Sequence, residues 1–419
     1  MTSYKYVILG GGTTAGFAAA EFVKQGVPVG ELCIVSNENI LPMNRPPLSK
    51  EYLQDEDKDG GILINKKDFY ELRGVDVKLE TWAQAVDFDA KTVDLNSDEI
   101  LHYDKLLIAT GSQLRYLDVP GNDLENIFYL RDITHSDAIR ECAIDADTAV
   151  VIGGGYIGTE TAASLTAHDV KVIMVLPEDH ILAKFAPSDI AGVFQQKFRE
   201  KGIDFIFNDL ATAFEGDGKV QEVVLKSGKR LHTDMVVVGV GVVPSLKLFK
   251  ETKLKIAKAI VVNEFCETNI PDVYAAGDVA EFPDLIFNKL RHVEHWENAF
   301  EQGEHVARVM MGIREPYFFL PYFFSDIFEY SYEYFGDPET ADAVVNRGDL
   351  SSGDFSTWWL DGNKVVAAFI MSTRPEAERK KVRDWIIQKS YINKDKISDA
   401  NIPVEELELF TRTDQDTIV

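Results

Sequence analysis

Two glycine-rich segments decide the fold: VILGGGTTAGFAAAEF at residues 7–22 and VVIGGGYIGTETAASL at residues 150–165. The segments align without a gap, and each predicts an apolar strand, a glycine-rich turn and a helix of small residues. A second apolar strand follows each helix, at 32–35 and at 170–175. The chain is therefore predicted to contain two βαβ units.

Other apolar runs end in glycine, at 106–111, 235–241 and 273–277. Continuous apolar strands that alternate with helices are typical of parallel sheets buried on both faces. The pattern changes near Pro321, where aromatic residues crowd the sequence. The runs 355–360 and 364–370, joined by Asp-Gly-Asn, predict a β-hairpin, and a helix from about 375 to 391 is expected to cover it.

Composition excludes several classes of protein. The 419 residues are 45% hydrophobic and 27% charged, which is typical of a globular chain and excludes collagen-like, coiled-coil or mainly disordered states. A net charge of −26 argues against nucleic acid or anionic lipid as partners. No apolar run is long enough for a membrane span, and no secretory signal is evident.

The three cysteines, Cys33, Cys142 and Cys266, lie far apart in the sequence. They form no disulfide framework, redox pair or zinc-site spacing, so we expect no metal and a cytoplasmic location. Monomer and homodimer both remain open.

The first glycine turn has the pattern of a dinucleotide site. Gly10 allows the sharp bend, Gly12 allows backbone to approach a pyrophosphate, and the small Ala15 lets the helix pack on the strand. Glu38, after the next strand, is placed to accept hydrogen bonds from ribose hydroxyls. The position of this turn at the start of a βαβ unit strengthens the interpretation.

The second turn repeats the pattern with Gly153, Gly155 and Gly158. Its ribose candidate is Glu178, which would repel a 2′-phosphate and so favours NADH over NADPH. The alternative is that Glu178 is only a solvated loop acid.

Two dinucleotide sites in one chain predict tightly held FAD at one and a diffusible nicotinamide at the other. Polar groups follow two further strands, in Ala109-Thr110-Gly111 and in Gly277-Asp278. In open α/β sheets, ligands bind at these carboxyl ends.

Together these motifs resemble the FAD-dependent pyridine-nucleotide oxidoreductases with the glutathione-reductase-like fold. The chain is most similar to the branch of ferredoxin and rubredoxin reductases, apoptosis-inducing-factor-like flavoproteins and monodehydroascorbate reductases, whose marker is Arg45-Pro46-Pro47-Leu48-Ser49-Lys50. The resemblance implies an α/β fold with two Rossmann-like domains and a C-terminal α+β domain. The expected bounds are 1–114 with 244–318 for FAD, 115–243 for NAD, 319–395 for the C-terminal domain and 396–419 for an acidic tail.

The resemblance also implies roles for individual residues. Lys50 would lie beside the flavin and stabilise its negative charge after hydride arrives, while Glu160 would pair with Lys50 near the nicotinamide. The remaining FAD contacts would come from Gly10, Gly12, Thr14, Ala15, Gly16, Glu38, Arg45, Ala109, Thr110, Gly111, Arg131, Gly277, Asp278, Glu294, His295, Trp296 and Phe324. The NAD contacts would come from Gly153, Gly155, Tyr156, Ile157, Gly158, Glu160, Glu178 and Gly241.

Each role has a structural alternative. Lys50 and Glu160 would otherwise form an ion pair of no consequence. Arg131 would be a surface side chain, and His295 and Trp296 would be core packing.

The sequence constrains the electron acceptor less tightly. Residues 39–52 contain no cysteine, which excludes the disulfide-reductase branches. Monodehydroascorbate reductase is a named enzyme that the chain resembles, through 26–32, 321–325 and 334–337. It has a tyrosine where this chain has Phe324 and a substrate-binding arginine where this chain has Phe300, which argues against an ascorbate radical.

The main hypothesis is therefore an NADH-dependent flavoprotein reductase that serves a ferredoxin- or rubredoxin-type protein, a quinone or another small one-electron acceptor. Five lysines within 247–258, and the cluster Arg379, Lys380, Lys381 and Arg383, could dock a small acidic protein, or could be solvated helix faces. The alternatives are a slow, redox-sensing flavoprotein like apoptosis-inducing factor and a monodehydroascorbate reductase.

Overall fold

The computed structural model describes residues 2–55 and 61–410. The chain folds into two compact units. Unit 1 comprises residues 1–45, 60–113 and 242–321, and unit 2 comprises residues 46–59, 114–241 and 322–419. Unit 1 contains most of the segments expected to bind FAD. Unit 2 contains both the expected NAD segment and the C-terminal segment, so the division into three domains stays a prediction.

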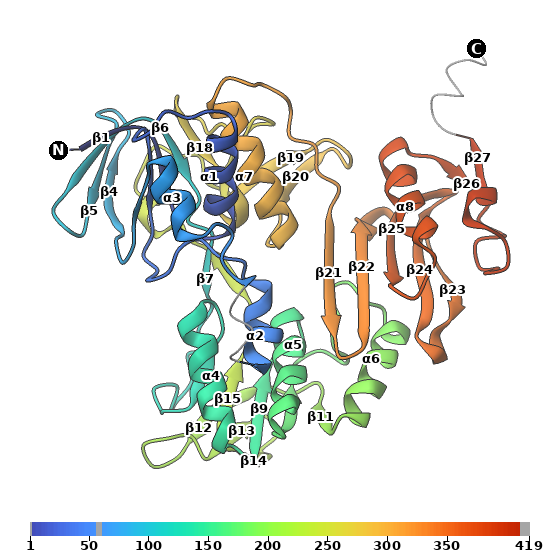
Figure 1. The fold of residues 1–419 in the computed structure, drawn as a ribbon. Helices are drawn as coiled ribbons and strands as arrows, with labels where there is room; N and C mark the ends of the chain where they lie inside the picture. The colour runs from blue at the N-terminus through green and yellow to red at the C-terminus, as the bar shows by residue number, and fades with distance from the viewer. Residues whose placement is uncertain (1, 56–60, 411–419) are drawn as a thin grey trace. The chain divides into compact units, whose positions relative to one another are not determined.

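The first βαβ unit builds the centre of unit 1 (Figure 1). Strand β1 (Thr2–Leu9) pairs in parallel with β2 (Leu32–Val35) on one side and with β6 (Ile100–Ile108) on the other. Strands β3 (Val75–Lys78) and β18 (Val273–Ala275) extend the parallel part, and β4 (Ala83–Asp87) and β5 (Thr92–Leu95) add an antiparallel edge. The chain reverses strand order at β1, where open α/β sheets bind ligands.

Both faces of this sheet are buried, as the continuous apolar strands predict. Val7 and Leu9 belong to one hydrophobic cluster, and Tyr6 and Ile8 belong to another on the opposite face. Helix α1 (Thr13–Lys24) packs against α7 (Trp296–Met310), and α3 (Lys67–Arg73) packs beside β3. A small sheet of β17 (Ile260–Val261), β19 (Ala280–Asp284) and β20 (Lys289–His292) completes unit 1.

The second βαβ unit forms the parallel sheet of unit 2. Its order is β11 (Ile203–Ile206), β10 (Lys171–Val175), β9 (Thr148–Ile152), β15 (Met235–Val238) and β8 (Ile127–Tyr129). Helix α4 (Ile133–Asp145) follows β8, α5 (Tyr156–Leu165) follows β9, and α6 (Ser188–Glu200) follows β10. Strands β12 (Ala211–Glu215), β13 (Glu222–Leu225) and β14 (Arg230–His232) form an antiparallel sheet. The short helices η1 (Pro46–Ser49) and α2 (Glu51–Gln54) lie against α4 and α5.

The C-terminal segment of unit 2 is an antiparallel sheet covered by one helix. Its order is β21 (Tyr322–Ile327), β22 (Tyr330–Gly336), β25 (Lys364–Met371), β24 (Asp354–Asp361) and β23 (Ala343–Asp349). The predicted hairpin is present as β24 and β25, and α8 (Glu376–Gln388) packs on β25. The expected fold class, two Rossmann-like domains with a C-terminal α+β domain, is confirmed.

The expected acidic tail differs from the structure over its first part. Residues 404–410 form the short helix η8 (Val404–Leu407) and strand β27 (Glu408–Phe410), which pairs with β26 (Tyr391–Ile392). The apolar side chains of Ile397, Val404 and Leu407 are buried, which is the physical reason that this part packs. Residues 411–419 lie outside the described residues.

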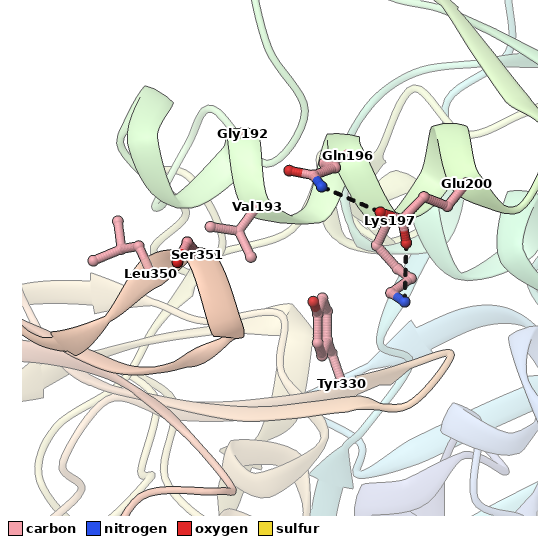
Figure 2. A pocket seen from close by; sticks show the side chains of 8 residues that line it. All are labelled: Gly192, Val193, Gln196, Lys197, Glu200, Tyr330, Leu350 and Ser351. Atoms are coloured by element: carbon pink, nitrogen blue, oxygen red, sulfur yellow. Dashed lines mark hydrogen bonds and ion pairs between the residues drawn. The ribbon is translucent and has the colours of Figure 1, made fainter.

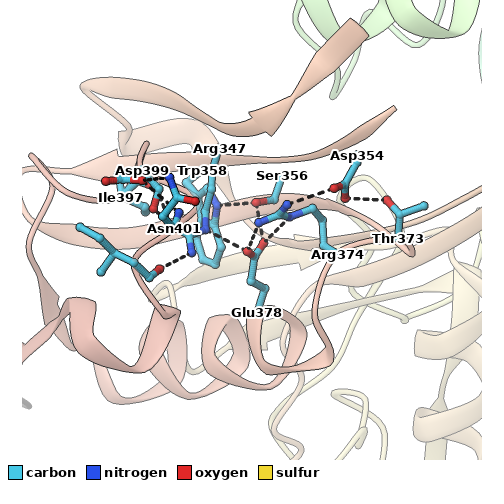
Figure 3. Close-up of polar contacts among 11 residues, drawn as sticks. Arg347, Asp354, Ser356, Trp358, Thr373, Arg374, Glu378, Ile397, Asp399 and Asn401 are labelled. Atoms are coloured by element: carbon cyan, nitrogen blue, oxygen red, sulfur yellow. Dashed lines mark hydrogen bonds and ion pairs between the residues drawn. The ribbon is translucent and has the colours of Figure 1, made fainter. Parts of the chain in front are cut away.

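Arg347 anchors the chain that leads into this segment, at residues 397–402 (Figure 3). Its buried guanidinium donates to the backbone carbonyls of Ile397, Asp399 and Ile402 and forms an ion pair with Glu378, 2.9 Å from Nε to Oε1. Arg374 pairs with the same carboxylate at 2.6 Å. A buried pair of this kind is costly to break from one side, because the partners left behind lose their hydrogen bonds.

We expect Arg347→Ala to lower the free energy of unfolding by about 3 kcal/mol. Urea unfolding measures that change, and hydrogen exchange should accelerate first in residues 397–402. Lys380→Ala is the control, since its pair with Glu376 is exposed on both sides and should change stability by less than about 0.5 kcal/mol. An equal, small effect of both variants would contradict the anchoring role.

Candidate functional site

The first glycine turn is built from residues that no larger side chain could replace. Gly10 has φ +124°, and a Cβ there would lie 2.1 Å from the carbonyl oxygen of Ala109. A Cβ on Gly11 would lie 2.0 Å from Ser36 Oγ. The turn between β1 and α1 is therefore packed directly on the ends of β6 and β2, which explains the run of glycines.

Helix α1 begins at Thr13 with Gly12 as its N-cap, and no side chain in the described part of the chain caps it. The amide groups of its first turn are therefore available for an anion such as a pyrophosphate. Two other glycines let backbone approach this turn. A Cβ on Gly277 would lie 2.3 Å from Thr14 Oγ1, and one on Gly303 would lie 2.6 Å from the Thr14 carbonyl oxygen. Ala15 and Gly16 are buried beneath the same turn.

Glu38 and Arg45, both expected to contact FAD, form an ion pair with each other. Both side chains are mostly buried, and an Arg45 Nη atom is 3.5 Å from the position that a Cβ on Gly12 would take. The structure thus brings the expected ribose and FAD contacts together at the glycine turn.

The other FAD candidates in unit 1 lie at strand ends or at the start of α7. Thr110 Oγ1 donates to the Ser245 carbonyl at 3.3 Å, and Gly111 has φ +62°. Asp278 lies in the short helix η5 (Gly277–Val279) directly after β18, and Trp296 Nε1 donates to Asn44 at 2.9 Å. Glu294 is exposed. Burial lowers the pKa of His295, the N-cap of α7, to about 4, so its ring is neutral at pH 7.

These features fit FAD in unit 1: an uncapped helix N-terminus, glycines where backbone must come close, and a carboxylate near the turn. Arg131 lies in unit 2, between β8 and α4, and is half-buried.

The second glycine turn has the same construction in unit 2. Gly153 has φ +110°, and its Cβ would lie 2.3 Å from the Gly239 carbonyl oxygen. A Cβ on Gly158 would lie 2.2 Å from the Gly153 carbonyl oxygen. Gly155, by contrast, faces open space at the uncapped start of α5. The turn therefore fits a second pyrophosphate.

The other residues expected to contact NAD differ in how much of their surface is exposed. Tyr156 is half-buried and stacks on Phe185, with ring centroids 4.8 Å apart and planes 6° from parallel. Burial raises the pKa of Tyr156 well above its ordinary value, so it acts as a neutral phenol. Ile157 and Glu178 are exposed, and Gly241 has φ +96° with open space around it. Their exposure leaves them accessible to a ligand.

Lys50 and Glu160 meet inside unit 2, as the resemblance implies. Lys50 Nζ lies 3.4 Å from Glu160 Oε1, and both side chains are nearly buried. Lys50 Nζ also lies 5.4 Å from the centroid of the Phe324 ring, which is 37% exposed. The structure thus brings together a buried ion pair and an accessible aromatic ring.

Two further residues at this pair were missed from the sequence. Ser49 Oγ donates to Glu160 Oε2 at 2.6 Å, and Ser325 Oγ donates to Glu160 Oε1 at 2.5 Å. Strand alternation gives a signal for Ser325, because it must face away from its exposed neighbour Phe324. Ser49 sits inside the quoted marker motif, beside Lys50.

A cleft of about 500 Å³ in unit 2 is separate from the candidate residues (Figure 2). It lies along α6 and is lined by Gly192, Val193, Gln196, Lys197, Glu200, Tyr330, Leu350 and Ser351. Lys197, the cation of this cleft, is already paired with Glu200 and Glu329. We therefore assign no ligand to it.

The cysteines are free thiols, and Cys33 and Cys266 are buried. Burial raises the pKa of Cys33 to about 12, so this thiol is unreactive at neutral pH. Within residues 2–55 and 61–410, His, Cys, Asp and Glu side chains form no group that could hold a metal ion. No helix in these ranges has the length and apolar character of a membrane span.

Comparison with known families covers almost the whole chain. Residues 4–303 match the pyridine nucleotide-disulphide oxidoreductase model, and residues 320–402 match the C-terminal domain model of monodehydroascorbate reductase 3-like proteins. The chain is 39% identical to the monodehydroascorbate reductase seedling isozyme of Cucumis sativus, over 90% of this chain and 92% of the relative. It is 38% identical to the monodehydroascorbate reductase of Pisum sativum, over 90% of this chain and 93% of that relative.

Solved structures give a second set of relatives. One chain of the covalent putidaredoxin reductase–putidaredoxin complex matches this chain with a TM-score of 0.90 and 28% identity. The match covers 97% of this chain and 97% of that one. The ferredoxin reductase for the CYP199A2 system of Rhodopseudomonas palustris has TM-score 0.91 and 28% identity, covering 96% of this chain and 99% of that one.

These relatives agree with the fold of two Rossmann-like domains and a C-terminal antiparallel-sheet domain. They support the monodehydroascorbate reductase alternative better than the main hypothesis drawn from the sequence. The chain belongs to the pyridine nucleotide-disulphide oxidoreductase family and is a pyridine-nucleotide-dependent FAD oxidoreductase.

Proposed function

We propose that this flavoprotein uses NADH to reduce a small organic radical of the monodehydroascorbate class. The observation that carries the proposal is similarity to monodehydroascorbate reductases over about nine tenths of both chains, including the C-terminal domain. When bound, FAD would accept hydride from NADH and pass electrons on one at a time. Lys50 would stabilise the negative charge of the reduced flavin, and Glu160 would orient the nicotinamide.

Phe300, at the position where the resemblance implies a substrate-binding arginine, predicts an acceptor site of lower polarity. Phe300 packs against Phe17, with ring centroids 4.4 Å apart, and stacks on Trp296 at 5.5 Å. It cannot supply the cation that an anionic radical would bind. We therefore expect a raised KM for the ascorbate radical and good turnover with phenoxyl or semiquinone radicals.

The experiment compares acceptors under identical conditions. NADH oxidation would be followed with monodehydroascorbate generated by ascorbate oxidase, with a phenoxyl radical, and with a ferredoxin coupled to cytochrome c. Faster NADH oxidation with either radical than with ferredoxin supports the proposal. Turnover with ferredoxin alone would contradict it.

A ferredoxin-type reductase is the second candidate function, because solved ferredoxin reductases cover this chain with TM-scores near 0.9. The exposed Phe324 beside Lys50 would also suit a protein partner. The basic cluster on α8 gives little support. Arg379, Lys380 and Lys381 pair with Glu333, Glu376 and Glu408 respectively, so their charge is largely neutralised.

Preference for NADH is proposed to depend on Glu178. Glu178→Arg should remove the repulsion of a 2′-phosphate and supply a cation for it, which shifts the NADH/NADPH ratio of kcat/KM by about tenfold toward NADPH. Steady-state kinetics with both nucleotides measures the ratio. Glu376→Arg, on an exposed face of α8, is the control and should leave the ratio unchanged. An unchanged ratio in Glu178→Arg would mean that other residues determine the preference for NADH over NADPH.

A further inference from the structure

Hydroxyl groups hold the Glu160 carboxylate on both of its oxygens. Ser49 donates to Oε2, Ser325 donates to Oε1, and Lys50 Nζ is the third neighbour, 3.4 Å from Oε1. Both serines are buried, with 1% and 0% of their surface exposed. A carboxylate offers about four acceptor positions, so most of those on Glu160 are filled by the protein itself.

These contacts matter because the carboxylate is almost removed from water. Burying a charge is costly unless hydrogen bonds replace hydration. Hydrogen bonds to an ionised group are shorter and about twice as strong as neutral ones, which agrees with the O–O distances of 2.5 and 2.6 Å. The two serines therefore stabilise the charge of Glu160 and restrict its side chain to one orientation.

The Glu160 carboxylate and its two hydroxyl donors come from three segments that are distant in sequence. Ser49 ends η1, Glu160 lies in α5, and Ser325 lies in β21 of the C-terminal segment. Ser164, one turn after Glu160, donates to the Ser49 backbone carbonyl at 2.7 Å and so fixes η1 on the same helix. In β21, neighbouring side chains point to opposite sides, so Ser325 faces Glu160 while Phe324 is partly exposed.

We infer that Ser49 and Ser325 are positioning residues for hydride transfer, which hold the Glu160 carboxylate beside Lys50 in the orientation that the nicotinamide requires. Ser325 thereby makes the C-terminal segment part of the nucleotide half of the reaction, in addition to any role toward the acceptor. The inference rests on the proposed role of Glu160 at the nicotinamide. It does not depend on the identity of the acceptor.

The test isolates the first half-reaction in the FAD-loaded protein. Ser49→Ala and Ser325→Ala would be mixed anaerobically with a series of NADH concentrations while the flavin absorbance is followed. We expect the limiting rate of reduction to fall about tenfold in each variant, since each loses one hydrogen bond to a charged group. The apparent dissociation constant of NADH should change less than about threefold, because most nucleotide contacts are retained.

Ser356→Ala is the matched control. Ser356 lies in β24 of the C-terminal segment, and its Oγ also donates to a buried glutamate, with 2.6 Å between Ser356 Oγ and Glu378 Oε2. It should lower the melting temperature without changing the limiting rate. A similar loss of rate in Ser356→Ala would mean that the serine effects are only structural, and would overturn the inference.

Glu160→Gln separates this inference from the proposed function. If Glu160→Gln slows flavin reduction and both serine variants keep the limiting rate within twofold, the inference is wrong and the proposed role of Glu160 stands. If Glu160→Gln also leaves the rate unchanged, the proposed role fails and the inference fails with it.

Discussion

Replacing Gly10 with alanine is expected to produce a protein that is purified without flavin. A Cβ at this position would overlap the Ala109 carbonyl oxygen at 2.1 Å, and φ +124° is a conformation that alanine avoids. The Ala109 oxygen belongs to the backbone and cannot rotate away as a flexible side chain could, so the β1–α1 turn or the end of β6 must move. We expect a loss of about 4 kcal/mol in the free energy of unfolding, in addition to loss of the cofactor.

The ratio of flavin to protein absorbance and urea unfolding measure these two effects. Gly192→Ala is the control, because Gly192 lies within α6 with open space around its Cβ position. That change should stabilise the helix by about 0.5–1 kcal/mol and leave the flavin content unchanged. A Gly10→Ala protein with full flavin content would show that the turn does not bind the cofactor.

Lys50→Met is expected to slow flavin reduction by NADH about 100-fold. Methionine keeps most of the length of the side chain but removes the cation 3.4 Å from Glu160 and 5.4 Å from the Phe324 ring. Negative charge on the reduced flavin would then lack its proposed partner, so the flavin potential should fall by about 30 mV. Stopped-flow absorbance and a dye-coupled potential measurement follow the two quantities.

The variant also leaves the buried Glu160 without its cation, which should lower stability. Lys50→Met combined with Glu160→Gln should recover much of that stability, because the unpaired charge is removed, but should not recover the rate. Lys380→Met, in an exposed pair, should match the parent in both measurements. Recovery of the rate in the double variant would contradict an electrostatic role for Lys50.

The sequence predicted the two βαβ units well because their turns depend on local chemistry. Gly10 and Gly153 both occupy positive φ, and a Cβ on either would lie within 2.3 Å of a backbone oxygen, so the glycine pattern reflects the geometry directly. The hairpin of β24 and β25 was predictable for a similar reason, since alternation and an Asp-Gly-Asn turn are short-range signals.

Contacts between distant segments were harder to predict. Ser49 and Ser325 meet Glu160 from 111 and 165 residues away, and no local pattern marks a serine as a partner of a glutamate. The packing of residues 404–410 was also missed, because the three glutamates there indicate an exposed tail, whereas the buried side chains of Val404 and Leu407 hold the segment. The electron acceptor stays a prediction, because Phe300 and Phe324 argue against an ascorbate radical, whereas similarity along the whole chain favours the monodehydroascorbate reductase alternative.

Anaerobic mixing of the purified protein with NADH, and separately with NADPH, tests whether the protein is an NADH-dependent flavoprotein reductase. We expect a bound flavin that is bleached rapidly by NADH and much more slowly by NADPH. Very slow bleaching with a persistent charge-transfer band would favour the redox-sensing alternative. A purified protein that carries no flavin and cannot be loaded with FAD would contradict the account.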